Sequence, residues 1–494
     1  MISCLFLLLA VYPACSHTTR DGVKHRVVVV GAGVSGFAAA ATLLENDVSD
    51  IVVLEASSRI GGRIHTVELG GIPVDLGAES INGEEDNDVY ELANSHGLLA
   101  SFKPFSKPEM NIYANTSGHI FDTSTIKPLA DKAYGIIKKE DEIKQFNGSM
   151  DDYLSPRLEE FLATNNVEPM LKEALRFHIE QLVRLYYGVY ELGQLGASGT
   201  TRYRMNEPVS LKWKTGGYKT IFDLLSKKFI NPADEIPVHS KILLDKKVTR
   251  IERLEDEVQV KTADGSTYHA DHVIVTLPLG VLKDGAENMF HPQLSERKTA
   301  AIKALGFGGV VKVFMLFPER WWPTDKNIIT PLFSEKELED FKKTSKHGNW
   351  SVNTAVFKPI LNSNRILCAW LTGPSVGFVE TLPIDTLEDG LMELLDRLVG
   401  KTYKLVKPES ILRSSWCNDP LFQGTYSYLS ADSDKGNITN EDLREPILSS
   451  NDKPVILFGG EATHPSYQST VHGAIAAGRR EANNVINYLK KQSI

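Results

Sequence analysis

The chain has 494 residues, with 54 Lys and Arg against 63 Asp and Glu, and a formal net charge of −9. This length exceeds what one hydrophobic core supports, so we expect at least two domains. The acidic balance argues against nucleic acid as the main partner and is compatible with a cationic small molecule. A content of 42% hydrophobic and 24% charged residues is ordinary for a soluble globular protein.

The first 16 residues, MISCLFLLLAVYPACS, form a short apolar stretch that ends in small residues. The stretch is too short to span a bilayer comfortably and is typical of the apolar region of a signal peptide. We therefore expect a secreted protein. Because no positive charge precedes the stretch, an uncleaved membrane anchor is the alternative, and only that alternative places the protein at a membrane.

Glycosylation sequons agree with a secretory route. The four N-x-S/T sequons begin at Asn115, Asn147, Asn349 and Asn437. Cleavage of the leader would leave two cysteines, Cys368 and Cys417, which could pair in an oxidising compartment. The sequence contains no cluster of residues at metal-ligand spacing, so we expect no metal.

Residues 25–45, HRVVVVGAGVSGFAAAATLLE, predict a buried strand, a glycine turn and a slim helix. Gly31, Gly33 and Gly36 have the G-x-G-x-x-G spacing. The first glycine permits a tight turn, the second lets the backbone approach a pyrophosphate, and the third lets helix and strand touch. The alternative is a tight turn of the kind found in any α/β protein.

A second strand, DIVVLEAS, ends at Glu55, nineteen residues after Gly36. An acidic side chain at this point accepts hydrogen bonds from ribose hydroxyls and would repel a 2′-phosphate. The two strands together predict a dinucleotide with an unphosphorylated ribose, NAD or FAD. The next segment, RIGGR, brings Gly62 and Arg63, which could approach phosphate or flavin edges closely; a glycine-rich turn is the alternative.

Further along the chain, residues 128–230 read as mostly helical, 272–282 as a buried strand, and 308–372 as strand-rich. Signals of a dinucleotide site return at 455–489. These signals at both ends predict an α/β protein in which a discontinuous Rossmann-like domain encloses an inserted α+β domain, a sheet roofed by helices. The expected boundaries are 25–100, 212–300 and 453–494 for the first domain, and 101–211 and 301–452 for the second.

The order G-x-G-x-x-G, Glu, R-x-G-G-R, D-x-G-A, followed by GGEATHP, TVHGA and GRREA near the C-terminus, resembles that of the FAD-dependent amine oxidases. The resemblance is closest to the polyamine oxidase and spermine oxidase branch and covers nearly the whole chain after residue 25. It implies that FAD is the cofactor. The cofactor-binding positions that it implies are Gly31, Gly33 and Gly36 for the pyrophosphate, Glu55 for the ribose, Gly62, Arg63, Gly77 and Ala78 for the flavin side, Val248 for the adenine, Glu461 for the diphosphate–ribityl turn, Trp416 for the flavin ring and Val471 for its pyrimidine.

Lys312 is the expected catalytic residue. It lies in the apolar alternating segment GGVVKVFMLF, where the residues alone would also allow an edge-strand lysine that reaches solvent. The resemblance implies that this lysine holds a water against flavin N5. The expected substrate-binding positions are Asn82, Tyr426 and Thr470, with Tyr426 as one wall of an aromatic slot whose ring faces favour cations.

The positions at which this chain differs from the family pattern give further predictions. Thr425 replaces the cysteine that tethers FAD in monoamine oxidases, so the FAD should be bound non-covalently, and Thr470 replaces an aromatic wall and opens the slot to longer amines. Asn82 stands where polyamine oxidases commonly carry His or Glu. Ser80 replaces the arginine of L-amino-acid oxidases, which argues against an amino acid substrate. The nearby acids, Glu79 and Glu84, could bind ammonium groups, but we expect a solvated acidic loop.

The expected function is oxidation of spermine, spermidine or their acetylated forms by hydride transfer to FAD. Oxygen would reoxidise the flavin, and the products would be an aldehyde, a shorter amine and hydrogen peroxide. Oxidation of another primary or secondary amine is one alternative. A flavin-fold binding protein with little catalysis is the other.

Overall fold

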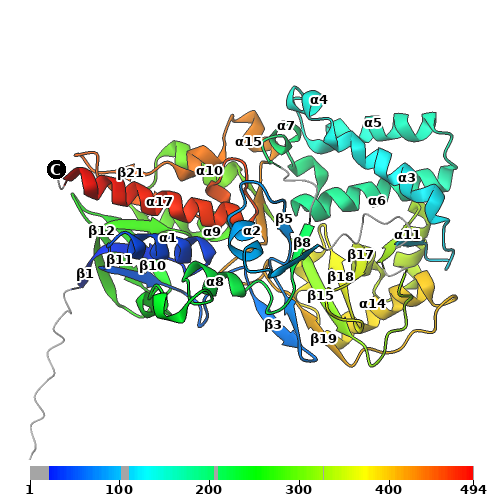
Figure 1. Cartoon of the computed structure of the whole chain (residues 1–494). Helices are drawn as coiled ribbons and strands as arrows, with labels where there is room; N and C mark the ends of the chain where they lie inside the picture. The colour runs from blue at the N-terminus through cyan, green and yellow to red at the C-terminus, as the bar shows by residue number, and fades with distance from the viewer. Residues whose placement is uncertain (1–21, 102–110, 205–209, 326–327, 493–494) are drawn as a thin grey trace, which may run out of the picture.

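The computed structural model describes residues 22–101, 111–204, 210–325 and 328–492. The leader predicted at residues 1–16 lies outside these ranges. Within them, no helix combines the length and the apolar character needed to cross a membrane. The described chain forms two halves side by side, and each is built around its own sheet (Figure 1).

The larger sheet has nine strands drawn from remote segments of the chain. Its order is β13-β10-β11-β12-β1-β2-β9, and β22 pairs with both β12 and β21. The central strands β9, β2, β1, β12 and β22 pair in parallel. The strands are β1 (Val23–Val30), β2 (Ile51–Leu54), β9 (Ile242–Leu243), β10 (Val248–Arg253), β11 (Val258–Thr262), β12 (Thr267–Val275), β13 (Phe290–His291), β21 (Ile447–Leu448) and β22 (Pro454–Phe458). This sheet confirms the predicted mixed α/β architecture.

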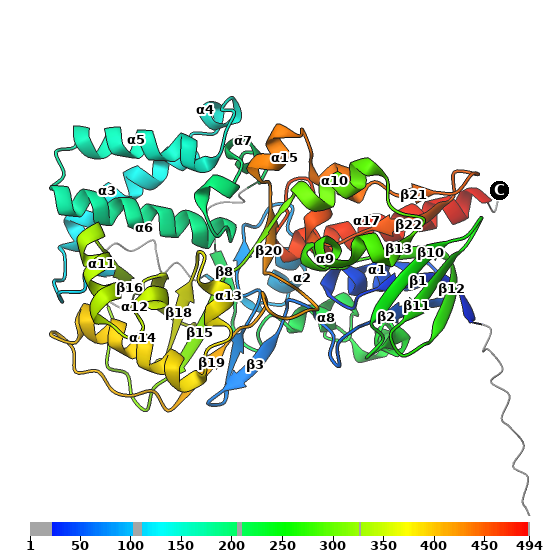
Figure 2. The same ribbon diagram turned by 180° about the vertical axis from the view of Figure 1, so that it is seen from behind.

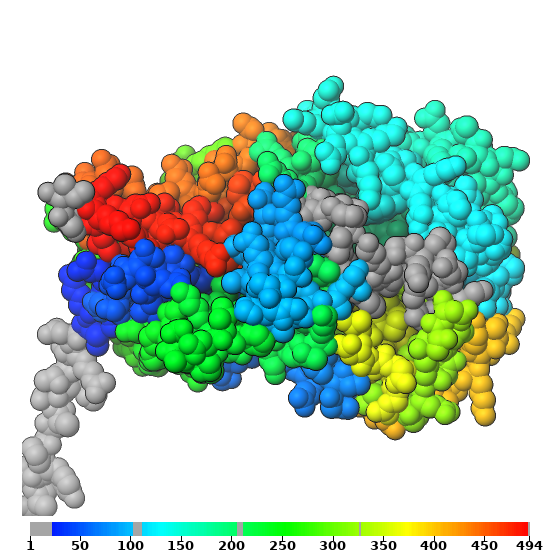
Figure 3. Space-filling view, in the orientation of Figure 1, coloured from blue at the N-terminus to red at the C-terminus, as the bar shows by residue number. Residues whose placement is uncertain are grey.

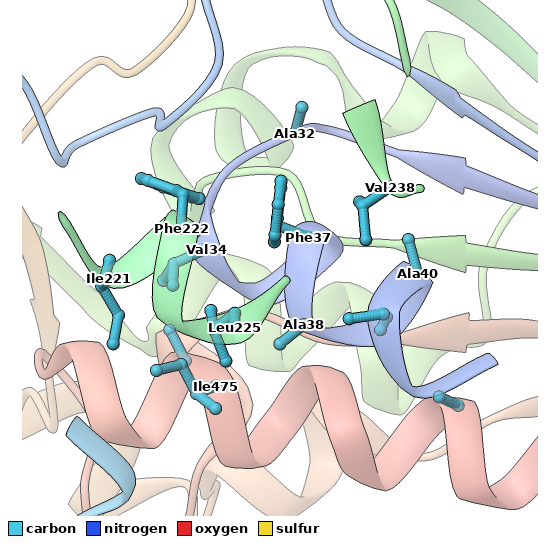
Figure 4. Packing of buried hydrophobic residues seen from close by; sticks show 14 of the residues in the cluster. Ala32, Val34, Phe37, Ala38, Ala40, Ile221, Phe222, Leu225, Val238 and Ile475 are labelled. Atoms are coloured by element: carbon cyan, nitrogen blue, oxygen red, sulfur yellow. The ribbon is translucent and has the colours of Figure 1, made fainter. Parts of the chain in front are cut away.

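The first strand and helix form as the sequence predicts. Residues 27–30 of β1 are fully or almost fully buried, because parallel neighbours cover both edges and helices cover the faces. The alanine-rich helix α1 (Val34–Glu45) packs against α17 (Val471–Gln492) and α8 (Thr220–Leu225). Figure 4 shows Val34 and Ala38 of α1 facing Leu225 and Ile475 across this contact.

The segment expected to be a buried strand over 272–282 is strand only at its beginning. β12 ends at Val275, and helix α9 (Leu279–Met289) begins directly after Pro278. Pro278 has no amide hydrogen to extend a strand ladder, whereas its fixed φ suits the start of a helix. The prediction was therefore wrong for the second half of the segment.

The second sheet has six strands in the order β19-β15-β18-β17-β16-β7. These are β7 (Asn111–Ala114), β15 (Val311–Leu316), β16 (Ile328–Pro331), β17 (Thr354–Pro359), β18 (Ile366–Leu371) and β19 (Ser410–Arg413). Helix α14 (Ile384–Val399) packs its leucine-rich side on one face, together with α11 (Glu335–Thr344) and α12 (Gly348–Ser351). Figure 2 shows this arrangement from behind.

The opposite face of the second sheet turns toward the first half of the molecule. There Phe314, Leu316 and Cys368 pack against the hairpin β3 (Thr66–Leu69) and β4 (Ile72–Asp75). Helices α3 (Thr123–Tyr134), α5 (Met150–Thr164) and α6 (Pro169–Tyr187) form a separate apolar cluster that reaches the sheet through Tyr113 and Leu332. The hairpin therefore links the glycine-rich N-terminal motifs to the second sheet.

The described residues form further short strands and helices. These are β5 (Ile81–Asn82), β6 (Leu99–Ser101), β8 (Ser210–Trp213), β14 (Gly306–Gly308), β20 (Tyr426–Tyr428), α2 (Asp88–Asn94), α4 (Glu140–Lys144), α7 (Ala197–Thr200), α10 (Glu296–Ala304), α13 (Val376–Val379), α15 (Ala431–Lys435) and α16 (Asn440–Arg444). Strand β21 joins the nine-stranded sheet although it precedes residue 453, where we expected the last segment of the first domain to begin. Cys368 and Cys417 are both free thiols.

Candidate active site

A cavity of about 500 Å³ lies where the two halves meet, a size typical of a small-molecule site. The predicted site residues that line it are Gly31, Gly33, Glu55, Gly62, Arg63, Gly77, Ala78, Asn82, Val248, Lys312, Trp416, Tyr426, Glu461, Thr470 and Val471. On the face seen in Figure 3, the light-blue segment that includes β5 and α2 covers the junction of the two halves. The structure therefore brings together residues from both ends and the middle of the chain.

The three glycines of the first motif have different environments. Gly31 has φ +101°, which an L side chain rarely adopts, and a Cβ at Gly33 would have no neighbour within 4 Å. The open space in front of Gly33 is what close approach of a phosphate group requires. Gly36, which we predicted to bind the cofactor, does not line the cavity; a Cβ there would lie 1.9 Å from the Gly31 carbonyl oxygen. Its role is to let α1 pack against the turn.

Glu55 directly follows β2 and lies beside the glycine turn. Its carboxylate accepts hydrogen bonds from the amides of Ala32 at 2.6 Å and Ser57 at 2.8 Å. Burial raises the pKa of Glu55, and these amides partly offset that rise. The carboxylate is thus oriented by the turn and lines the cavity where a ribose is expected.

Arg63 and Glu461 join the two terminal motifs. Arg63 Nη1 donates to Glu461 Oε1 and to the Thr425 carbonyl oxygen, each at 2.8 Å. The other carboxylate oxygen of Glu461 accepts hydrogen bonds from the Ser427 hydroxyl and the Ser469 amide. Both oxygens of Glu461 are therefore committed to holding the cavity wall. Thr425 also hydrogen-bonds the Gly308 carbonyl through its hydroxyl.

Lys312 is the second residue of β15 and is buried, with 3% of its surface exposed. Its ammonium group donates to the carbonyls of Asp75 and Gly77 and to Glu79 Oε2 at 2.8 Å. An ammonium group has three N–H donors, so these acceptors use all of them. The water-holding role implied for Lys312 would require one of these bonds to be exchanged.

Glu79 contradicts the expectation of a solvated acidic loop. Its side chain is largely buried, with 13% exposed, and forms ion pairs with Lys212, Lys312 and Lys358. Burial alone would raise the pKa of Glu79, but the three ammonium groups outweigh burial and hold the pKa well below its usual range. Burial lowers the pKa of Lys212 to about 8. Glu84, by contrast, is exposed.

Lys358 and Trp370 were missed by the sequence analysis. Both line the cavity, and Lys358 Nζ lies 4.2 Å from the centre of the Trp370 ring. The signal was present, because Lys358 lies in the apolar segment TAVFKPI just as Lys312 lies in its own apolar strand. A buried lysine in a strand with no acidic neighbour in sequence implies a distant partner, here Glu79.

The C-terminal helix begins at the cavity. The Thr470 hydroxyl accepts a hydrogen bond from the Gly473 amide and so caps α17, which starts at Val471. Two buried side-chain atoms of cavity-lining residues, Gln468 Oε1 and His472 Nε2, have no hydrogen-bond partner among the described residues. Burial lowers the pKa of His472 to about 4, which keeps the ring neutral. The open space in front of Gly33 and these unpartnered polar atoms fit a polar ligand such as a dinucleotide.

The remaining predicted residues form the side walls. Trp416 is buried, donates its indole N–H to the Leu76 carbonyl at 3.2 Å and packs edge-on against Phe422. The Tyr426 hydroxyl donates to the Leu185 carbonyl at 2.9 Å, so its ring is fixed as part of the wall. Asn82 lies in β5 and is exposed although it lines the cavity. Val248 begins β10 at the dinucleotide end.

Comparison with known proteins relates this chain to flavin-containing amine oxidases. The family model described as flavin containing amine oxidoreductase matches residues 34–486. The chain is 28% identical to probable polyamine oxidase 5 of Arabidopsis thaliana, over 94% of this chain and 99% of that protein. It is 29% identical to peroxisomal N(1)-acetyl-spermine/spermidine oxidase of Bos taurus, over 95% of this chain and 96% of that protein. Polyamine oxidase 1 of Oryza sativa subsp. japonica is 29% identical, over 94% of this chain and 98% of that protein.

Proposed function

This chain belongs to the family of flavin-containing amine oxidoreductases, and from that premise we propose that it oxidises polyamines, with FAD as cofactor and O2 as electron acceptor. The observation that carries the proposal is one continuous cavity, lined at one end by Gly31 and Glu55 and at the other by Lys312 of the second sheet. The relatives named polyamine oxidase or acetyl-spermine/spermidine oxidase supply the substrate class.

The residues that would hold FAD are those of the two terminal motifs. Gly33 leaves open space for the diphosphate, and Gly31 supplies the positive φ of the turn beside it. Glu55 would accept hydrogen bonds from the ribose, and Arg63 and the first turn of α17 lie along the cavity wall. Bound FAD would supply an acceptor for a hydride from the carbon next to the amine nitrogen and a route for the electrons to oxygen. Because the Thr425 hydroxyl is hydrogen-bonded to Gly308 and no cysteine stands there, we propose that FAD is held without a covalent bond.

The chain's own residues supply position and environment. Trp416, Tyr426 and Tyr428 are fixed aromatic walls that align an amine and exclude bulk water. Burial of the amine in this cavity lowers its pKa and favours the neutral form from which a hydride can leave. Lys312 acts as a positioning residue, because its bonds to the Asp75 and Gly77 carbonyls hold the loop that carries Ala78 and Glu79.

A peroxide assay tests the proposal. Purified protein should release hydrogen peroxide with spermine, spermidine or N-acetylspermine and much less with tyramine or leucine. Retained FAD without peroxide from any amine would contradict the enzymatic function and favour a flavin-fold binding protein.

One observation favours a second candidate, the oxidation of another primary or secondary amine. Among the described residues that line the cavity, the acids are Glu55, Glu79 and Glu461, and each carboxylate is already engaged by protein donors. A polyamine would need carboxylates for its distal ammonium groups. Activity with simple amines at the expense of all polyamines would select this candidate.

We also propose that the protein enters the secretory pathway. Support comes from the apolar leader and from three sequon asparagines that are exposed, Asn147, Asn349 and Asn437. Asn115 is buried, and its side-chain oxygen accepts hydrogen bonds from its own turn, so it is the least suited to carry a glycan. N-terminal sequencing of protein exported from eukaryotic cells, with glycan mapping, tests this. Retention in the cytosol with an intact leader would contradict it.

A further inference from the structure

The wall of the cavity that the second sheet contributes differs in character from the other walls. Lys312 of β15, Lys358 of β17 and Trp370 of β18 all line the cavity at this end, next to Glu79. The polar groups of the three sheet residues are all hydrogen-bond donors. Among the described residues, Glu79 is the one acidic side chain that lines the cavity at this wall. The Asp75 carboxylate, which interacts electrostatically with Lys312 and Glu79, does not line the cavity.

The carboxylate of Glu79 has little capacity left for a ligand. Its Oε1 pairs with Lys212 and with Lys358 at 3.2 Å, and its Oε2 pairs with Lys312 at 2.8 Å. One negative charge thus faces three positive ones, and all four side chains are largely buried. The wall therefore carries an excess of positive charge, which a low-dielectric surrounding strengthens.

Two donors at this wall still need acceptors. Lys358 has one hydrogen-bond acceptor among the described residues, Glu79, and so retains further N–H donors. The Trp370 indole N–H is buried and has no partner in the described part of the chain. Because Lys358 Nζ lies 4.2 Å from the Trp370 ring, the two donors belong to one small region.

Buried donors without acceptors are costly, and a ligand that supplies an oxygen acceptor relieves that cost. A second ammonium group at the same place would bring only donors and would be repelled by the lysines. This wall therefore distinguishes between amines by their second polar group, and it favours an oxygen acceptor over an ammonium group.

We propose that Lys358 and Trp370 form a specificity subsite that takes an oxygen acceptor of the amine substrate, an acyl carbonyl or a carboxylate, in preference to a second ammonium group. This inference rests on the proposed function in that the ligand is an amine. Among the proposed substrates it favours acetylated polyamines over spermine and spermidine, because the acetyl end presents a carbonyl oxygen.

Binding to the FAD-loaded protein, measured by calorimetry without oxygen, tests the subsite independently of catalysis. The probes are a straight-chain eight-carbon diamine, its mono-N-acetyl derivative and the amino acid of the same length. The two oxygen-bearing probes should bind wild-type protein at least about tenfold more tightly than the diamine. If the amino acid gains more affinity over the diamine than the N-acetyl derivative does, charge is the main contribution. If both probes gain equally, hydrogen bonding is the main contribution.

Lys358→Met should reduce this preference to below about threefold, and Lys358→Arg should retain it. Lys298→Met is the matched control, because Lys298 is also a buried lysine 4.2 Å from an aromatic ring, that of Phe458, but does not line the cavity. If Lys358→Met does not fold, Trp370→Phe, which removes only the N–H, should selectively weaken binding of the acyl probe.

A wild-type preference for the diamine, absence of binding by all three probes, or an unchanged preference in Lys358→Met would overturn the inference. Failure of the peroxide assay bears on the proposed function alone, because the binding measurement requires no turnover.

Discussion

Arg63 and Glu461 lie 398 residues apart in sequence, yet their guanidinium and carboxylate groups are 2.8 Å apart. Arg63 follows the N-terminal glycine motifs, whereas Glu461 follows β22 and leads to α17. This ion pair therefore joins the N-terminal and C-terminal sequence motifs at the wall of one cavity. Three further hydrogen bonds join the same two side chains to Thr425, Ser427 and Ser469.

The first prediction concerns this pair. Arg63→Met leaves one oxygen of the buried Glu461 unpaired, so we expect a loss of about 1–3 kcal/mol in unfolding free energy and at least about tenfold weaker FAD binding. Chemical denaturation and flavin titration measure the two effects. Glu339→Gln, in an exposed pair with Lys343, should change the unfolding free energy by less than about 1 kcal/mol. Equal effects of the two variants would contradict the role of the pair.

The second prediction separates two glycines of one motif. Gly33→Ala should fold with little change in stability, because its Cβ meets nothing within 4 Å and its φ of −65° suits alanine. It should nevertheless bind FAD more weakly, since the methyl group occupies the space left for the diphosphate. Gly36→Ala should fail to fold properly, because its Cβ would lie 1.9 Å from the Gly31 carbonyl oxygen. Thermal unfolding and flavin titration of both variants are the measurements. A stable Gly36→Ala protein would show that the helix contact tolerates a side chain.

The third prediction concerns Lys312. Lys312→Met removes the donor to two buried carbonyls and to Glu79, so we expect a loss of about 3–5 kcal/mol in unfolding free energy. Lys303→Met, which breaks an exposed pair with Glu287, should cost less than about 1 kcal/mol. If denaturant midpoints of the two variants coincide, Lys312 does not hold the loop as described.

The fourth prediction concerns acid stability. Burial lowers the pKa of His178 to about 4, so the folded protein keeps this ring neutral while the unfolded chain takes up a proton below about pH 6.5. The unfolded state then binds more protons, and the unfolding free energy should fall as pH decreases from about 6.5 to 4. The limiting slope is about 1.4 kcal/mol per pH unit for each such histidine.

Denaturant unfolding across this pH range measures the effect. His178→Gln should flatten the pH dependence by the contribution of one histidine. An unchanged slope in this variant would show that His178 is not the neutral buried group described.

Local features of the fold could be predicted from the sequence, and features that depend on distant partners could not. Gly31, Gly33, Glu55 and the strands before them lie within one short segment whose pattern determines its own geometry. The pairs of Glu79 with Lys212, Lys312 and Lys358 join residues 133, 233 and 279 positions apart. No local pattern near Glu79 distinguishes such a buried carboxylate from a solvated one.

The error at residues 272–282 has a different origin. The apolar run continues through Leu279 and Leu282, but Pro278 divides it into a strand and a helix, and both are buried in the same core. Apolar content alone does not separate a buried strand from the buried side of a helix. The proline was the decisive signal.

The most direct measurement of the central claim is the FAD content of the purified full-length chain. If residues 25–83 and 455–489 form one dinucleotide site with no covalent attachment, the protein should carry one FAD per chain, and acid or heat should release it intact. Colourless protein that binds no added FAD, or flavin that stays attached after denaturation, would contradict the account.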